Sequence, residues 1–227
     1  MYNSYRLSRL PWLLPLPLLL ACQTREKQGA QVAVAAAEAA DTSKADPRLA
    51  KADLSRIQGT ATARAWLVIV SDFQCPYCKR WHDSSGEAIR REYVAPGKIR
   101  VAYVNYPLGQ HVQAVPTAEA AMCAGLEDKF WQYHDALFAT QKRWHELGDA
   151  TPVLDSLARA LGLNVAQHKL CRDQHVMLPL ISADRDRANN AGASSTPTFL
   201  VAGRVLKGVY PLDMMRQILD AAVAQAR

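Results

Sequence analysis

The chain has 227 residues, of which 49% are hydrophobic and 21% are charged, and its formal net charge at pH 7 is +6. This charge is modest, and the basic residues are scattered among acidic ones without forming a stripe interleaved with aromatics. We therefore expect no nucleic-acid surface. The length is enough for one domain of ordinary to large size with a real hydrophobic core.

The N-terminus has the pattern of an export signal. Arg6 and Arg9 are followed by an apolar stretch over residues 10–20, which three prolines interrupt. This stretch is too short and too broken to be a comfortable transmembrane helix. The sequence LLAC at residues 19–22 resembles the bacterial lipobox, in which the cysteine becomes the lipidated first residue of the mature chain. We predict a lipoprotein signal peptide over residues 1–21 and a lipid anchor at Cys22; ordinary cleavage that leaves Cys22 unmodified is the alternative.

The cysteine count agrees with a lipid anchor. The chain has five cysteines, and an exported protein seldom keeps a spare exposed thiol. Lipidation of Cys22 leaves two pairs, Cys75 with Cys78 and Cys123 with Cys171. The residue after the lipobox is glutamine rather than aspartate, which by resemblance to Gram-negative lipoproteins favours the outer membrane over the inner one.

Residues 22–50 are rich in Ala, Gln and small polar residues and contain no aromatic residue, so we expect a flexible tether. After it, the pattern predicts a strand over 64–71, a helix from 75 to about 94 with a break near 84–86, and a strand over 99–106. This order is a βαβ unit, whose right-handed crossover would make the two strands parallel.

The stretch from about residue 111 to 192 contains helical patterns and no convincing strand. The expected helices cover residues 117–125, 129–140, 151–161 and 178–191. Thr151 has the character of an N-cap, with a proline at the first helical position after it. Strands over 198–202 and 204–206 then form a hairpin around Gly203, and an amphipathic helix over 211–224 closes the chain.

The segment from Cys75 to Cys78 places two thiols between a strand and a helix, as a dithiol redox centre requires. Cys75 would lie at the helix N-terminus, where unpaired N–H groups and the helix dipole stabilise a thiolate. It would be the attacking sulfur, and the shielded Cys78 would resolve the mixed disulfide. Pro76 suits the first helical turn, which does not need its missing N–H.

Two cysteines at this spacing can also belong to a zinc site, a haem attachment site or an inert disulfide. A zinc site needs two more ligands, but only His82 is near in sequence and the six histidines form no cluster, so we predict no metal. Covalent haem would need histidine directly after the second cysteine, where the chain has Lys79. No glycine-rich phosphate loop is present, and we predict no cofactor. An inert disulfide remains an alternative.

Four motifs in order resemble the DsbA-like thiol-disulfide oxidoreductases. They are DFQCPYC at 72–78, AAMCA at 120–124, KFWQYHDALF at 129–138 and STPTF at 195–199. The resemblance runs from about residue 54 to the C-terminus. It implies an α/β thioredoxin fold, a mixed sheet flanked by helices, over residues 51–227, with an inserted all-helical subdomain at about 111–192.

The resemblance also assigns residues outside the dithiol segment. Pro197 would be a cis-proline facing the two cysteines, and the backbone of Thr196 would pair with an extended substrate segment; a trans proline at a strand start is the alternative. Cys123 and Cys171 would form a structural disulfide within the helical insertion, unless they are two separately buried thiols.

Two positions depart from the family pattern. Many relatives have a glutamate six residues before the first active-site cysteine, where it relays protons to the buried second sulfur, but this chain has Ile69. Asp72 or water would have to replace it. Tyr77 is neutral where the strongest oxidants carry histidine, so Lys79 and Arg80 would have to supply any positive charge near Cys75.

The resemblance to DsbA-like proteins implies a monomeric periplasmic enzyme that oxidises cysteines of exported proteins, and the lipobox implies that a lipid tethers it to a membrane. A separate redox partner would regenerate its disulfide. A reductase or an isomerase would use the same residues. A tethered binding module whose cysteines do not turn over is the rival from another class.

Overall fold

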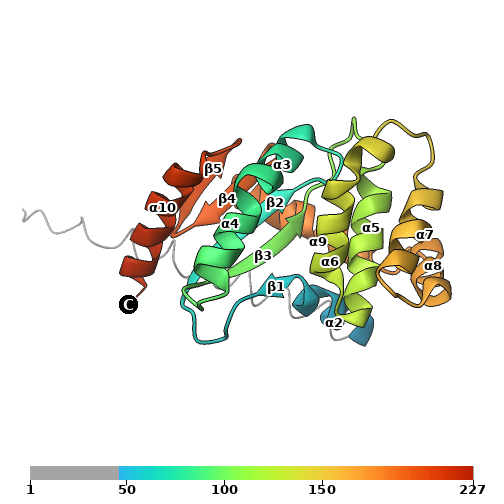
Figure 1. Cartoon of the computed structure of the whole chain (residues 1–227), viewed down its shortest axis with the longest axis horizontal. Coiled ribbons are helices and arrows are strands. Elements are labelled where there is room, and N and C mark those ends of the chain that lie inside the picture. The colour runs from blue at the N-terminus through green and yellow to red at the C-terminus, as the bar shows by residue number, and fades with distance from the viewer. Residues whose placement is uncertain (1–45, 227) are drawn as a thin grey trace, which may run out of the picture.

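The computed structural model describes residues 46–226 of the chain (Figure 1). The predicted signal peptide, Cys22 and the range 23–45 of the predicted tether lie outside the described residues. Helix α2 (Pro47–Ser55) begins four residues before the predicted start of the domain. The sequence contains the usual start signals of a helix at this point. Asp46 is the N-cap and accepts a hydrogen bond from the Arg48 N–H at 2.9 Å, and Pro47 occupies the first helical turn.

Five strands form one mixed sheet in the order β1-β3-β2-β4-β5. The strands are β1 (Ile57–Gln58), β2 (Ala65–Ser71), β3 (Ile99–Asn105), β4 (Thr198–Val201) and β5 (Arg204–Lys207). β2 and β3 are parallel, as the βαβ pattern predicts, and the other neighbours are antiparallel. β1 was not predicted, because two residues are too few to show a period.

A continuous helical segment connects β2 to β3. It consists of α3 (Pro76–Trp81), a π-helical turn η1 (His82–Gly86), α4 (Glu87–Ile89) and a second π-helical turn η2 (Arg90–Val94). The break predicted near residues 84–86 is therefore a widened turn rather than an interruption. Gly86 packs against the ring of Trp81, where an added Cβ would lie 3.4 Å from the indole.

Helices cover both faces of the sheet. The C-terminal helix α10 (Leu212–Gln225) lies beside α4 (Figure 1). The hydroxyl of Tyr93, in the turn η2 that follows α4, donates to Asp220 of α10 at 2.8 Å. Side chains alternate along a strand, so Val70 faces away from Ile69 and packs with Ala188 of α9 (Leu178–Asn190) on the other face.

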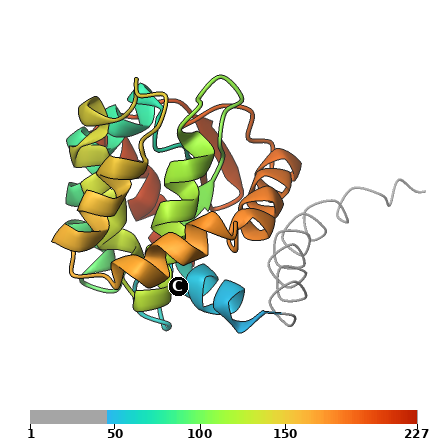
Figure 2. The ribbon, with the colours of Figure 1, turned by 90° about the vertical axis from the view of Figure 1, so that its right-hand side faces the viewer.

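The remaining helices gather at one end of the sheet (Figures 1 and 2). They are α5 (Ala114–Ala124), the 3-10 turn η3 (Gly125–Glu127), α6 (Phe130–Ala139), the 3-10 turn η4 (Gln141–Arg143), α7 (Thr151–Ala160) and α8 (Val165–Asp173). Within residues 46–226, no helix combines the length and apolarity needed to cross a bilayer.

Two details of this helical insertion differ from prediction. Thr151 is the first residue of α7 rather than its cap, and its N–H donates to the Asp149 carboxylate at 2.8 Å. Helix α8 was missed because the face it buries includes His168 and Arg172, so its apolar period is weak. Asn164, which caps it by accepting from the Gln167 N–H, was the available signal.

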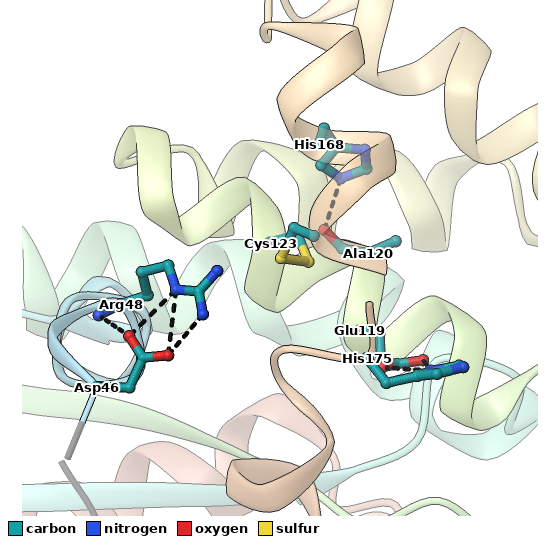
Figure 3. The surroundings of a disulfide bond; sticks show 8 residues. Asp46, Arg48, Glu119, Ala120, Cys123, His168 and His175 are labelled. Carbon is teal, nitrogen blue, oxygen red and sulfur yellow. Dashed lines mark hydrogen bonds and ion pairs between the residues drawn. A yellow bond between two sulfur atoms is a disulfide. The ribbon is translucent and has the colours of Figure 1, made fainter. Parts of the chain in front are cut away.

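A disulfide between Cys123 and Cys171 joins α5 to α8, with their Cα atoms 6.0 Å apart (Figure 3). The two cysteines are therefore not separate buried thiols. Beside the bridge, His168 Nε2 lies 2.9 Å from the carbonyl oxygen of Ala120, which adds a second link between the same two helices.

Replacing both Cys123 and Cys171 by alanine should lower the free energy of unfolding by roughly 4 kcal/mol, the loop-closure value for a bridge of this length. Urea denaturation of the variant and of wild type measures this loss. The matched control is a variant with alanine at Cys75 and Cys78. Its free energy of unfolding should stay close to that of wild type whose Cys75–Cys78 pair is reduced. An unchanged midpoint in the first variant would show that the bridge adds nothing.

Candidate active site

Cys75 lies where the loop after β2 meets α3, and Cys78 lies in the first turn of that helix. Cys75 is the N-cap of α3 and Pro76 occupies its first turn. The carboxylate of Asp72 accepts hydrogen bonds from the N–H groups of Gln74 at 2.7 Å and Leu108 at 3.0 Å, which fixes the loop against the segment after β3. The Asp72 turn and Pro76 thus place Cys75 at the N-terminus of α3.

Cys75 and Cys78 are both free thiols, and their side chains are 3% and 2% exposed. A hydrogen bond from the Cys78 thiol lowers the pKa of Cys75 to about 6, and Thr196 and backbone N–H groups of the helix act in the same direction against burial. Burial raises the pKa of Cys78 well above its ordinary value. At neutral pH the pair therefore holds one thiolate, on Cys75.

The charged neighbours of this turn do not assist the thiolate. The Lys79 ammonium pairs with Asp83 at 2.8 Å, and the guanidinium of Arg80 lies over the exposed ring of Tyr77, 5.1 Å from its centroid. The sequence analysis required Lys79 and Arg80 to lean back toward Cys75, and in this structure they lean toward Asp83 and Tyr77 instead. The leading groups that lower the pKa of Cys75 are the Cys78 thiol, the Thr196 side chain and backbone N–H groups of the helix.

Alkylation of the reduced protein by iodoacetamide should therefore rise with pH through about pH 6 and then level off, because only the thiolate attacks. Below that pH, Cys75 becomes protonated and the rate should fall. In Cys78→Ala, which removes the main donor, the midpoint should move toward the ordinary thiol value of 9.0. Mass spectrometry of the Cys75 peptide gives the rates; a wild-type midpoint near 9 would contradict the assignment.

The segment before β4 faces the dithiol. The bond between Thr196 and Pro197 is cis, and the carbonyl oxygen of Thr196 lies 3.6 Å from the Cys75 sulfur. The alternative of a trans proline does not hold. Thr196 is thus a direct neighbour of Cys75 in space, although the two residues are 121 positions apart in the sequence. Pro197 follows it at the same side of the dithiol.

Ile69 is buried beneath the active-site helix, where it lines a small cavity with Trp81, His82 and His134. The carboxylate of Asp72 is not a free acceptor for a proton from Cys78, because both of its oxygens already have hydrogen-bond partners. Besides the two N–H groups, His111 Nδ1 lies 2.7 Å from its second oxygen, and burial raises the pKa of Asp72. Asp72 is a loop-fixing residue in this structure.

The histidines do form a cluster, which corrects the sequence analysis. Oδ1 of Asp135 lies 3.1 Å from His82 Nε2, 2.8 Å from His134 Nδ1 and 2.8 Å from the guanidinium of Arg90. Two histidines and a carboxylate can hold a metal ion. Here Arg90 already supplies a positive charge to the same oxygen, so we interpret the cluster as a hydrogen-bonded link between η1 and α6.

Two loops beside the dithiol are held by glutamines. Gln74 accepts from the Gln113 N–H at 2.7 Å, and the Gln113 side chain donates to the carbonyl of Leu147 at 2.9 Å. These loops carry the exposed apolar side chains of Val112 and Leu147, and Tyr77 is exposed on the helix itself. The dithiol thus lies near apolar surface that sequence reasoning did not identify.

Comparison with known proteins identifies the family of this chain. The thioredoxin family model matches residues 51–221. The Na(+)/H(+) antiporter NhaA 3 of Salinispora tropica is 31% identical over 176 residues, which are 77% of this chain but only 26% of that protein. The probable disulfide bond formation protein D of Bacillus cereus is 25% identical over 165 residues, covering 71% of this chain and 76% of the relative.

The crystal structure of oxidised BdbD from Bacillus subtilis superposes with a TM-score of 0.68 at 21% identity, over 74% of this chain and 92% of that one. This likeness confirms the predicted mixed sheet with a helical insertion. Because the family model covers most of the sequence, and because the sheet and the dithiol loop agree with it, the chain belongs to the thioredoxin family.

Proposed function

We propose that this chain is a thiol-disulfide oxidoreductase of the cell envelope that oxidises cysteines of exported proteins. The observation that carries the proposal is the opposite perturbation of two adjacent thiols, with a lowered pKa at Cys75 and a raised one at Cys78. Perturbed pKa values of this kind are typical of functional sites. The name of the Bacillus cereus relative supports the oxidising direction.

In the proposed reaction a substrate thiolate attacks Cys75 of the Cys75–Cys78 disulfide. The bond between the two sulfurs breaks, and Cys78 leaves with the electron pair. A second substrate thiolate then attacks the substrate sulfur of the mixed disulfide and releases Cys75 as a thiolate. The substrate loses two electrons, the pair gains them, and a separate redox partner must reoxidise it.

The substrate groove is proposed to lie along Thr196 and Pro197, with Pro76 and Tyr77 on its other side. The carbonyl of Thr196 already contacts the Cys75 sulfur, so an extended segment that pairs with this backbone would bring its cysteine to the correct atom. The exposed apolar side chains of Tyr77, Val112 and Leu147 would contact the substrate or the redox partner.

A reductase or isomerase would use the same residues. The second candidate from another class is a non-catalytic binding module. Similarity to about a quarter of a protein named as an Na(+)/H(+) antiporter favours it, since that name describes a different activity.

Oxidative refolding of a reduced, unfolded protein distinguishes the two candidates. Wild type should accelerate recovery of the native disulfides, and Cys75→Ala should not. The variant lacking Cys123 and Cys171 retains the dithiol and is the matched control. Equal behaviour of wild type and Cys75→Ala would favour the binding module.

We further propose that the protein acts as a monomer in the periplasm, anchored through lipidated Cys22, in the outer membrane rather than the inner. The disulfide between Cys123 and Cys171 supports the lipid anchor. Of the five cysteines, these two form one pair and Cys75 with Cys78 forms another, so Cys22 is the one left over. Cys22→Ala should move the protein to the soluble fraction. Unchanged membrane fractionation would contradict the anchor.

A further inference from the structure

Each oxidising turnover must place a negative charge on a buried sulfur. Cys78 is the leaving group of the proposed reaction, and its side chain is almost completely enclosed. Burial makes a thiolate there costly, and it raises the pKa of Cys78 well above the ordinary value. Ile69 offers no polar group to offset this cost. Other side chains must therefore stabilise the leaving sulfur.

Two hydroxyl groups lie on the face of the sheet that the active-site helix covers. Ser71 follows Ile69 by two residues on β2, so both point to the same face. Tyr103 of β3 is paired with Ile69 in the parallel register, which places it on this face as well. The residues Ser71 and Tyr103 are 3% and 1% exposed, respectively.

The Tyr103 hydroxyl is in an unusual position for a buried polar group. Among residues 46–226 it has no hydrogen-bond partner of ordinary geometry, and such a group is costly to bury. Its ring is held between Phe73, at 5.0 Å between centroids, and His134, at 5.1 Å. The hydroxyl is thus fixed in place by packing, on the face of the sheet that Ser71 also faces.

The surrounding titratable groups identify what this donor faces. Burial, followed by the charge of Cys78, raises the pKa of Tyr103 well above its ordinary value, and Asp72 and Cys75 act in the same direction. The Ser71 hydroxyl acts against burial: it lowers the pKa of Tyr103 and also that of Cys78. The geometry agrees, since Ile69, Cys78 and Tyr103 belong to one buried cluster and Ser71 faces the same side of the sheet as Ile69.

We infer that the Ser71 hydroxyl donates the hydrogen bond that stabilises Cys78 as it leaves as a thiolate, and that Tyr103 is a positioning residue that orients Ser71. This inference rests on the proposed function and deepens it. Both hydroxyls keep their protons, so no proton acceptor is required: the sulfur–sulfur electron pair moves to Cys78, and its charge is held by the serine donor.

Other candidates for this role are occupied. The Asp72 carboxylate can only accept, and it already takes hydrogen bonds from Gln74 and Leu108. His134 uses its Nδ1 on Asp135, and burial lowers its pKa to about 4, so it is neutral at pH 7. Among the causes that lower the pKa of Cys78, the Ser71 hydroxyl comes first and the backbone N–H of Asp72 second, so Ser71 is the side-chain donor that a substitution can test.

The test is the rate at which excess glutathione reduces the oxidised full-length protein at neutral pH. Ser71→Ala should slow this step about tenfold, as expected for a lost hydrogen bond to a charged group. Ser71→Thr keeps the hydroxyl and should restore most of the rate. Tyr103→Phe should slow the step less, and adding it to Ser71→Ala should cause no further loss, because Tyr103 acts through Ser71.

A pH profile separates this role from a general loss of structure. The attack of Cys78 on a glutathione mixed disulfide at Cys75 follows the Cys78 thiolate, so its midpoint should move to higher pH in Ser71→Ala and in Tyr103→Phe. Tyr133→Phe is the matched control, since it removes a buried hydroxyl that donates to Leu154 at 2.8 Å on the far side of α6. It should leave the midpoint unchanged.

The outcomes distinguish the two proposals. If wild type is not reduced and does not oxidise a substrate, the proposed function fails. If wild type turns over but Ser71→Ala matches Tyr133→Phe in rate and midpoint, the inference about Ser71 and Tyr103 is overturned and the function stands. Should Tyr103→Phe not fold, the comparison of Ser71→Ala with Ser71→Thr decides alone.

Discussion

Replacing Cys78 by Ser should leave the protein covalently joined to its substrate through Cys75, whereas replacing Cys75 by Ser should reduce turnover to the uncatalysed level. The reason is the division of charge between the thiols: in the reduced protein Cys75 is the thiolate that attacks a substrate disulfide, and Cys78 is the thiol that would attack the resulting mixed disulfide and release the substrate. Non-reducing electrophoresis of each variant after incubation with a protein that carries a disulfide measures the trapped complex, because the Cys75 thiolate can displace one sulfur of that disulfide.

The double variant lacking both active-site cysteines is the control and should form no complex. Mass spectrometry of the trapped species should place the linkage at Cys75. Trapping that is equally strong in Cys75→Ser and Cys78→Ser would mean that the two sulfurs are interchangeable. The assigned order of attack would then be wrong.

The largest expected effect on stability comes from Asp184 in α9, whose side chain is completely buried. Its carboxylate accepts hydrogen bonds from the buried guanidinium of Arg56 and, at 3.0 Å each, from the backbone and side-chain nitrogens of Asn105. Asp184→Ala leaves the buried Arg56 without its main partner. We expect a loss of about 3–5 kcal/mol in the free energy of unfolding, measured by urea denaturation.

Asp213 provides the matched comparison. It also pairs with an arginine, Arg216, at 2.7 Å, but its side chain is 87% exposed. Asp213→Ala should cost less than about 1 kcal/mol, because water screens an exposed pair. Equal losses in the two variants would show that burial does not set the strength of the Asp184 pair.

This buried pair also shows why part of the fold cannot be read from the sequence. Arg56 and Asp184 are 128 positions apart, and each resembles an ordinary surface charge when considered alone. By contrast, β2, β3 and the helices α5, α6, α7 and α9 were predictable, because each has its own apolar period. α8 and β1 were not, since one buries polar residues and the other is two residues long.

The candidate site divides in the same way. Cys75, Cys78 and the Thr196–Pro197 pair belong to short motifs, so their roles could be predicted without coordinates. Ser71 and Tyr103 carry no motif, and their relation depends on the parallel register that sets Ile69 beside Tyr103. The cluster at Asp135 likewise requires α6 to dock against η1.

The equilibrium constant between the Cys75–Cys78 pair and glutathione tests the central claim most directly. Stabilisation of the Cys75 thiolate favours the reduced pair, which makes the disulfide a stronger oxidant. The account predicts a reduction potential closer to about −120 mV, typical of a strong oxidant, than to about −270 mV, typical of a thiol reductase. A potential at or below about −270 mV, or a pair that does not equilibrate with glutathione, would contradict it.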